Sequence, residues 1–303
     1  MDRELLTPER LAGLSESERD RLSLLLRARE FGTSLGLAKS KSYRHLIERS
    51  EEDAVRVVVA APTNRLEAVS WWFPLVGHVT YRGYFDPARA SRFAEKLERR
   101  GLDTYVRPAL LYSTLGWFDD PIPRGVLAWP DADVVDVAIH ELVHETIYVP
   151  SDTAYNEALA TFIAKEGALL FFQGDAKRRR EAERLFDDRV QFAGLLDRMA
   201  AELTELYAVA ASEAAAVQGR EEIFERFQEE HFDALRWNTE RYLRFPTRLL
   251  NNAWVVAQVT YLGELDCFAA WFAELDHDLE ALISDVLEHP GDVPLELEAC
   301  APA

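Results

Sequence analysis

Two predicted helices in tandem, each bounded by residues that start or stop a helix, constrain the fold of this chain most. Pro130 and the aspartates after it begin a helix that we expect to run to about Tyr148, because acidic side chains there accept free N–H groups and favour the positive end of the helix dipole. Pro150 ends this helix. Residues 151–153, Ser-Asp-Thr, can cap a second helix over about 154–172. The short break predicts that the second helix turns back and packs beside the first.

The first of these helices contains the pentapeptide His140-Glu141-Leu142-Val143-His144. Histidines four residues apart lie on one face of a helix, so both imidazoles can reach one metal ion. Zinc favours neutral imidazole nitrogen, and a catalytic zinc keeps one position for water. Glu141 lies close to the same face and could accept a proton from that water. The pentapeptide therefore predicts a zinc site with Glu141 as general base. The alternative is a buried histidine and a surface histidine with no metal.

The second helix offers a third ligand. Glu157 lies 13 residues after His144, and a helix that turns back can aim its carboxylate at the same ion. The result is a His, His, Glu set, one of the common catalytic zinc arrangements. Asp152 and Glu166 compete for this role, but Asp152 is better used as a helix cap and Glu166 lies about two and a half turns farther along. Asn156 suits a hydrogen bond beside the site better than a bond to the metal.

For the whole chain, including the two tandem helices, the sequence predicts a predominantly helical α+β fold. We expect a small sheet in the N-terminal half, built from strands at about 55–61, within 69–85, at 104–110 and at 125–129, beside helices in the first 50 residues and over 87–100. From Ala176 onward, apolar residues recur every three or four positions with a break at Gly219, which predicts a long antiparallel helical hairpin. We expect an N-terminal α+β region over 1–130 and a helical catalytic region over 131–303, within one compact unit.

The charge balance excludes some classes of partner. The chain has 34 Lys and Arg against 53 Asp and Glu, so its net charge is −19. This charge repels phosphate backbones and argues against nucleic acid as the main partner. No apolar run approaches the roughly 20 residues that span a bilayer, and the N-terminus has no apolar signal core. We expect a soluble chain, cytoplasmic by default, or periplasmic or lipid-anchored if a leader was trimmed. The oligomeric state stays open.

The two cysteines, Cys267 and Cys300, are too few for a disulfide framework. They could form one bridge or none. We expect two isolated thiols, because a free cysteine commonly behaves as a small buried apolar residue.

Four segments carry a family resemblance. They are HELVHETIYVPSDTAYNEALATFIAKEG from His140, WWFPLVGHVTYRGYF at 71–85, YSTLGWFDDP at 112–121 and LNNA at 250–253. Together they resemble a bacterial family of zinc aminopeptidases, whose aminopeptidase label is itself inferred. Two features depart from the family pattern. Tyr155 stands where the family usually has Phe before Asn-Glu, and no lipoprotein signal is visible.

The resemblance implies a gluzincin-type peptidase, in which a zinc helix and a second helix carrying Glu lie in a wider α+β body. Peptide hydrolysis passes through an oxyanion that needs a second donor beside the metal. Among several candidates we favour Tyr112 and Tyr261 for this role. The remaining candidates are Ser113, Thr114, His78, Tyr81 and Arg82. A substrate amine could be held by Asp119 or Asp120, and less readily by Glu264.

We therefore expect a zinc metallopeptidase that acts on a peptide or small amide. Among such enzymes we favour an aminopeptidase. His140, His144 and Glu157 would bind Zn²⁺, and Glu141 would act as general base. One alternative is an endopeptidase or other amide hydrolase on the same site. Another is a non-catalytic, metal-stabilised scaffold. Cobalt, nickel or iron would also suit these ligands.

Overall fold

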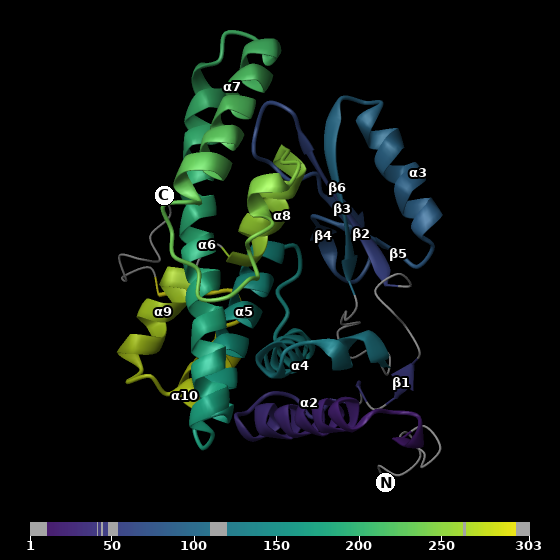
Figure 1. Cartoon of the computed structure of the whole chain (residues 1–303), viewed down its shortest axis with the longest axis vertical. Coiled ribbons are helices and arrows are strands. Elements are labelled where there is room, and N and C mark those ends of the chain that lie inside the picture. Colours follow the sequence, from purple (N-terminus) through teal and green to yellow (C-terminus); the bar gives the residue numbers. More distant parts are fainter. Residues whose placement is uncertain are drawn as a thin grey trace. The chain divides into compact units, whose positions relative to one another are not determined.

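The structure is a computed structural model that describes residues 11–40, 42–43, 45–47, 54–109, 120–262 and 265–294. The fold is predominantly helical α+β, with small sheets in the N-terminal half, as the sequence predicts (Figure 1). The chain forms two compact units that interleave in sequence. Unit 1 comprises Met1–Ala54, Ala109–Ala182 and Glu264–Ala303, and unit 2 comprises Val55–Pro108 and Glu183–Gly263. The division at residue 130 stays a prediction.

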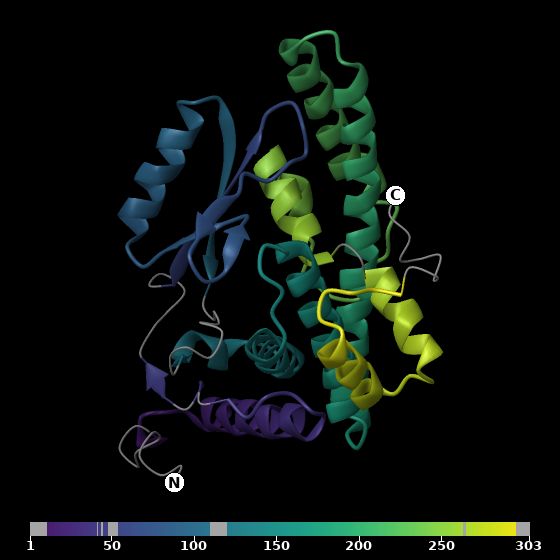
Figure 2. The ribbon, with the colours of Figure 1, turned by 180° about the vertical axis from the view of Figure 1, so that it is seen from behind.

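Unit 1 is built around the two tandem helices. α4 spans Asp131–Thr146 and α5 spans Thr153–Phe171, close to the predicted bounds. They pack against each other, and α2 (Glu16–Ser34) packs against both. Figure 2 shows the yellow helices α9 (Leu265–Glu274) and α10 (Leu279–Glu288), which contact α5. A parallel strand pair, β1 (Leu46–Ile47) and β7 (Ile122–Pro123), completes the unit together with the short helix η1 (Arg124–Ala128).

Glycines permit the close packing of these helices. A Cβ at Gly167 of α5 would lie 3.0 Å from Ile139 Cδ1 of α4, and a Cβ at Gly32 of α2 would lie 3.0 Å from Leu142 Cδ1 of α4. Ile139 and Leu142 are both fully buried. Because an added methyl group would be tighter than an ordinary van der Waals contact, glycine lets α2 and α5 approach α4 closely.

Unit 2 combines a small sheet with long helices. Strand β2 (Val55–Pro62) lies between β5 (Arg82–Tyr84) and β6 (Leu102–Ala109), while β3 (Trp71–Phe73) and β4 (Gly77–Val79) form a separate antiparallel pair. α3 (Pro87–Glu98) buries Ala90, Ala94 and Leu97 against Val58 and Ala60 of β2. α8 (Asn252–Leu262) also contacts β2.

A long helix and its shorter partner complete unit 2. α6 (Ala176–Val209) runs from the end of unit 1 into unit 2 and is followed by α7 (Glu213–Arg226). The predicted break at Gly219 is wrong, because α6 ends at Val209 and the Ser212 side chain caps α7. Gly219 lies inside α7, where a Cβ would come within 2.7 Å of Leu206 Cδ1. Glycine therefore serves helix packing at this position rather than chain reversal.

Two further expectations are wrong. The predicted strand at 125–129 is the 3₁₀ helix η1, because a short apolar run buries its side chains equally well in either form. Cys267 in α9 is disulfide-bonded rather than an isolated thiol. Pairing depends on tertiary proximity, which the spacing of cysteines in a sequence does not report. Cys300 lies outside the described residues. Among the described helices, none combines the length and apolar character needed to cross a membrane.

A two-pronged ion pair joins α2 to η1 and makes a testable contribution to stability. Arg124 donates from Nε to Glu18 Oε1 at 2.6 Å and from Nη2 to Glu18 Oε2 at 3.1 Å. Glu18 also closes the capping box at the start of α2 with Ser15. The hydrogen bond from Arg124 is the largest cause that lowers the pKa of Glu18 from 4.5 to about 2.

We expect Arg124→Gln to lower the free energy of unfolding by about 1 kcal/mol at pH 7. Because the pKa of Glu18 is depressed in the folded state, its contribution is complete above pH 4.5 and is lost as the pH falls from 4.5 toward 2. Urea unfolding at a series of pH values measures the effect. Arg65→Gln, which removes the exposed pair of Arg65 with Glu67, is the matched control with little expected change. A loss that is the same at every pH would contradict this account.

Candidate metal centre

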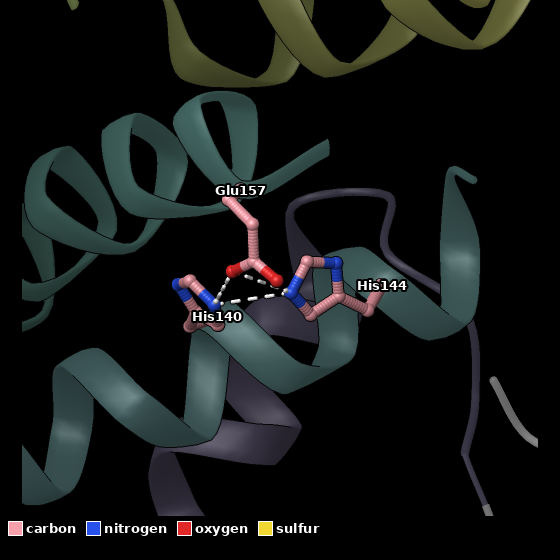
Figure 3. Close-up of side chains that lie close together, drawn as sticks. All are labelled: His140, His144 and Glu157. Atoms are coloured by element: carbon pink, nitrogen blue, oxygen red, sulfur yellow. Dashed lines mark hydrogen bonds and ion pairs between the residues drawn. The ribbon is translucent and has the colours of Figure 1, made fainter. Parts of the chain in front are cut away.

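Three predicted ligands meet in unit 1. α4 supplies His140 and His144 from one face, and α5 supplies Glu157 from the facing helix (Figure 3). Glu157 Oε2 lies 3.4 Å from His140 Nε2 and 3.5 Å from His144 Nε2, and the two Nε2 atoms are 3.1 Å apart. The side chains are 15%, 11% and 8% exposed for His140, His144 and Glu157. Three polar atoms from two helices thus surround one point in a largely buried site.

The spacing of these atoms fits a metal ion. A tetrahedral zinc with bonds of about 2.0–2.1 Å holds its ligand atoms about 3.3 Å apart. The observed separations of 3.1, 3.4 and 3.5 Å lie on either side of that value. Imidazole nitrogen and carboxylate oxygen are also ligand types that zinc accepts. Among the described residues, this His-His-Glu group is the one cluster of such side chains that could hold a metal.

Glu157 and His144 each stabilise the charged form of the other. Burial alone would raise the pKa of Glu157, but the charges and hydrogen bonds of His144 and His140 outweigh it and lower that pKa. Burial alone would lower the pKa of His144, but Glu157, with a smaller effect from Glu141, outweighs it and raises that pKa. Glu157 is therefore held as a carboxylate, the form that binds a cation.

Glu141 lies beside the cluster on α4 and is 7% exposed. Burial raises its pKa, while His140 and His144 act in the opposite direction. Within the described part of the chain, its Oε2 atom is buried and has no hydrogen-bond partner. A carboxyl group with one unpaired oxygen next to a potential metal site can accept a proton from a small molecule there.

Asn156 fixes the turn that joins α4 to α5. Its Oδ1 accepts from Val149 N at 2.8 Å and its Nδ2 donates to Val149 O at 2.7 Å. Asn156 is 3% exposed and immediately precedes Glu157. The expected hydrogen bond beside the site thus goes to the backbone, and no sequence pattern indicated Val149 as its partner. Asp152 caps α5 by accepting from Tyr155 N at 3.0 Å, as expected.

Two aromatic residues near the site were missed by the sequence analysis. Tyr148 follows α4 and is half-buried, and its pKa is raised first by burial and then by the negative charge of Glu157. Tyr43 is fully buried, and its pKa is raised first by burial and then by the negative charge of Glu141. Tyr148 belongs to the motif that carries the histidines, so its position could have been suspected. Tyr43 lies far from Glu141 in the sequence and in no motif.

The other predicted site residues belong to several parts of the chain. Glu166 pairs with Lys165 at 2.8 Å, which fits its exclusion as a ligand. Tyr261 belongs to α8 in unit 2, but its side chain lies outside the described part. Asp120 is 3% exposed in unit 1. His78, Tyr81 and Arg82 belong to unit 2. The candidates that lie outside the described residues are Tyr112, Ser113, Thr114, Asp119 and Glu264.

Comparison with known proteins places the chain in one family. No curated protein and no solved structure matches it. A family model described as "Putative aminopeptidase" matches residues 8–291. This match includes both helices that carry the His-His-Glu group and parts of both compact units. Because the match covers nearly the whole chain, the protein belongs to this putative aminopeptidase family.

Proposed function

We propose that this protein is a zinc-dependent peptidase that cleaves peptides from a free amino terminus. The observation that carries the proposal is the convergence of His140 Nε2, His144 Nε2 and Glu157 Oε2 to within 3.1–3.5 Å of one another. Catalytic zinc sites commonly use three protein ligands, whereas structural zinc sites are closed by four. Among the described residues the cluster has three members. Membership of the aminopeptidase family supports peptide hydrolysis.

The protein's own residues would divide the chemistry as follows. His140, His144 and Glu157 hold the metal, which when bound supplies a Lewis acid for the scissile carbonyl and for water. Glu141 accepts a proton from the attacking water and later donates it to the leaving amine. Its Oε2, which has no hydrogen-bond partner among the described residues, supports this role. No covalent bond to the protein is needed, so no nucleophilic side chain is required.

Tyr112 and Tyr261 are proposed as donors to the oxyanion, because Tyr112 lies in one family motif and Tyr261 follows the last residue of another, Ala253, by eight residues. A phenol that donates to the developing negative charge stabilises the transition state more than the bound substrate. The net charge of −19 is compatible with a substrate that carries a cationic amine.

The first test is the metal content of the purified protein, compared with that of Glu157→Ala and Glu141→Gln. We expect about one zinc per chain in the wild type, loss of the metal in Glu157→Ala because one of three ligands is gone, and retention in Glu141→Gln. Glu141→Gln should lower kcat by about 10²–10⁴-fold, because it removes the general base. Free and N-blocked peptides are assayed on the same samples.

The outcomes of this comparison distinguish an aminopeptidase from the alternative functions. Cleavage of free peptides alone supports an aminopeptidase, whereas cleavage of blocked peptides supports an endopeptidase or another amide hydrolase. Zinc without turnover of any peptide favours a metal-stabilised scaffold. A wild-type protein that binds no zinc contradicts the proposal and every residue role within it.

We also expect Asn156→Ala to weaken zinc binding by about 10–100-fold, because the turn that aims Glu157 loses both hydrogen bonds to Val149. Competition with a chelator measures the affinity. Asn251→Ala is the matched control. The side-chain amide of Asn251, in unit 2, also makes two hydrogen bonds to the backbone. It donates to Thr104 O at 2.9 Å and accepts from Trp254 N at 2.8 Å. Equal zinc affinities in the wild type, Asn156→Ala and Asn251→Ala would show that the hydrogen bonds of this turn do not position Glu157 for metal binding.

The oxyanion roles predict that Tyr112→Phe or Tyr261→Phe lowers kcat by about 10²–10³-fold while zinc content is unchanged, because only the phenol hydroxyl is removed. Steady-state kinetics with metal analysis measures both quantities. Tyr105→Phe, at a tyrosine packed against the core of unit 2, is the control. Wild-type kcat in either variant would remove that tyrosine from the mechanism.

A further inference from the structure

Helix α9, yellow in Figure 2, packs against the first half of α5, which contains Glu157. Phe268 of α9 is fully buried. Its ring meets that of Tyr155 edge-on, with 5.7 Å between the ring centres, and lies 6.1 Å from that of Phe162. Tyr155 and Phe162 precede and follow Glu157 on α5. Because such buried aromatic contacts fix how two helices pack, the position of α9 bears on the position of the proposed metal ligand.

Helix α10 and the segment after it contact the same pair of helices. Trp271 Nε1 of α9 donates to Asp285 Oδ2 of α10 at 3.0 Å, which joins α9 to α10, and α10 contacts α5. After α10, Gly291 has a φ of 89°, and a Cβ there would lie 3.3 Å from side-chain carbons of Val149. The segment after α10 therefore lies against the turn that Asn156 holds through Val149.

The disulfide-bonded residue Cys267 immediately precedes Phe268 in α9 and is buried with it. The sequence contains one other cysteine, Cys300, which lies outside the described residues. Within a single chain, Cys300 is therefore the partner of Cys267. A bond between them closes a loop of about 30 residues, which includes α10 and the segment that lies against Val149.

We propose that a disulfide between Cys267 and Cys300 holds α9, α10 and the segment after α10 against the helices of the metal centre, and that its reduction lowers the affinity of the His-His-Glu group for zinc. To form the bond, two thiols lose two protons and two electrons, which a disulfide such as oxidised glutathione takes up to give two thiols. Such a bond persists in an oxidising compartment and opens in a reducing one. The effect on zinc rests on the proposed function, whereas the bond itself does not.

The first test identifies the bond. The full-length chain is equilibrated with oxidised glutathione, unfolded in the presence of an alkylating reagent, digested and analysed by mass spectrometry. We expect no alkylated cysteine and one cross-linked pair of peptides, containing Cys267 and Cys300, from a monomeric chain. Two alkylated cysteines, glutathione adducts on both, or a disulfide-linked dimer would overturn the proposal.

The second test measures the contribution of the bond to stability without zinc. Urea unfolding of the metal-free wild type is followed with and without a phosphine, which opens the bond to two thiols and takes an oxygen atom from water. We expect reduction to raise the unfolding equilibrium constant roughly 30–1,000-fold, because the unfolded chain gains freedom when the loop opens. Cys300→Ser, which keeps the buried Cys267, is the matched control: it should match the reduced wild type and be insensitive to the phosphine. An unchanged midpoint in the reduced wild type would overturn the proposal.

The third test concerns the metal centre. Competition with a chelator measures the zinc affinity of the oxidised wild type, of the reduced wild type after removal of the phosphine, and of Cys300→Ser. We expect about 5–10-fold weaker binding in the last two, since α9 and α10 then hold α5 and the turn at Val149 less firmly. Equal affinities in all three proteins would overturn the coupling between the bond and the metal centre.

The outcomes separate this inference from the proposed function. A wild type that binds zinc and cleaves peptides, but yields no cross-link between Cys267 and Cys300, overturns only the disulfide. A wild type that binds no zinc overturns the proposed function and the effect on metal affinity, while the cross-link and the urea midpoints still decide whether the bond holds α9 and α10 in place.

Discussion

The turn between α4 and α5 is the constraint on which the whole site depends. Two histidines on one helix face follow from local geometry alone, but the carboxylate of Glu157 reaches them only because α5 folds back along α4. Asn156 holds that turn by bonding both backbone groups of Val149. Gly167 allows α5 to approach Ile139 of α4 closely. A turn of different length or a wider helix spacing would separate these three side chains by more than one metal ion could bridge.

Burial of the charged groups in this site carries a free-energy cost that neighbouring groups must offset. A carboxylate taken out of water needs compensating charge or hydrogen bonds. Glu157 finds them in His140 and His144, which lower its pKa. Glu141 lies in the same region, and the negative charge of Glu157 is one of the causes that raise its pKa. Two carboxyl groups and two imidazoles in a largely buried region favour an added cation, because a cation would offset the repulsion between the acidic groups.

The part of the site that the sequence predicted is the part governed by local rules. His140 and His144 share a face because of helix periodicity, and the proline and aspartate signals located both helices to within about two residues. Tyr43 could not be found in this way, because its φ of 56° and its place near the charge of Glu141 arise only in the folded chain. The same holds for Gly219 in α7, where a Cβ would lie 2.7 Å from Leu206 Cδ1 of α6. The disulfide bond of Cys267 is a further feature that depends on the folded chain and that the local sequence does not predict.

The motifs that lie in unit 2 point to packing rather than chemistry where their side chains are described. Asn252 is fully buried, donates to Pro62 O at 2.9 Å and accepts from Tyr207 Oη at 2.8 Å. In the aromatic motif, the guanidinium of Arg82 lies 5.0 Å from the ring centre of Phe93, beside Tyr84. These contacts explain why a fold would need such residue types at these positions without any part in hydrolysis. Motif membership therefore carries less weight for a catalytic role than a place beside the His-His-Glu group, which Glu141 has on α4.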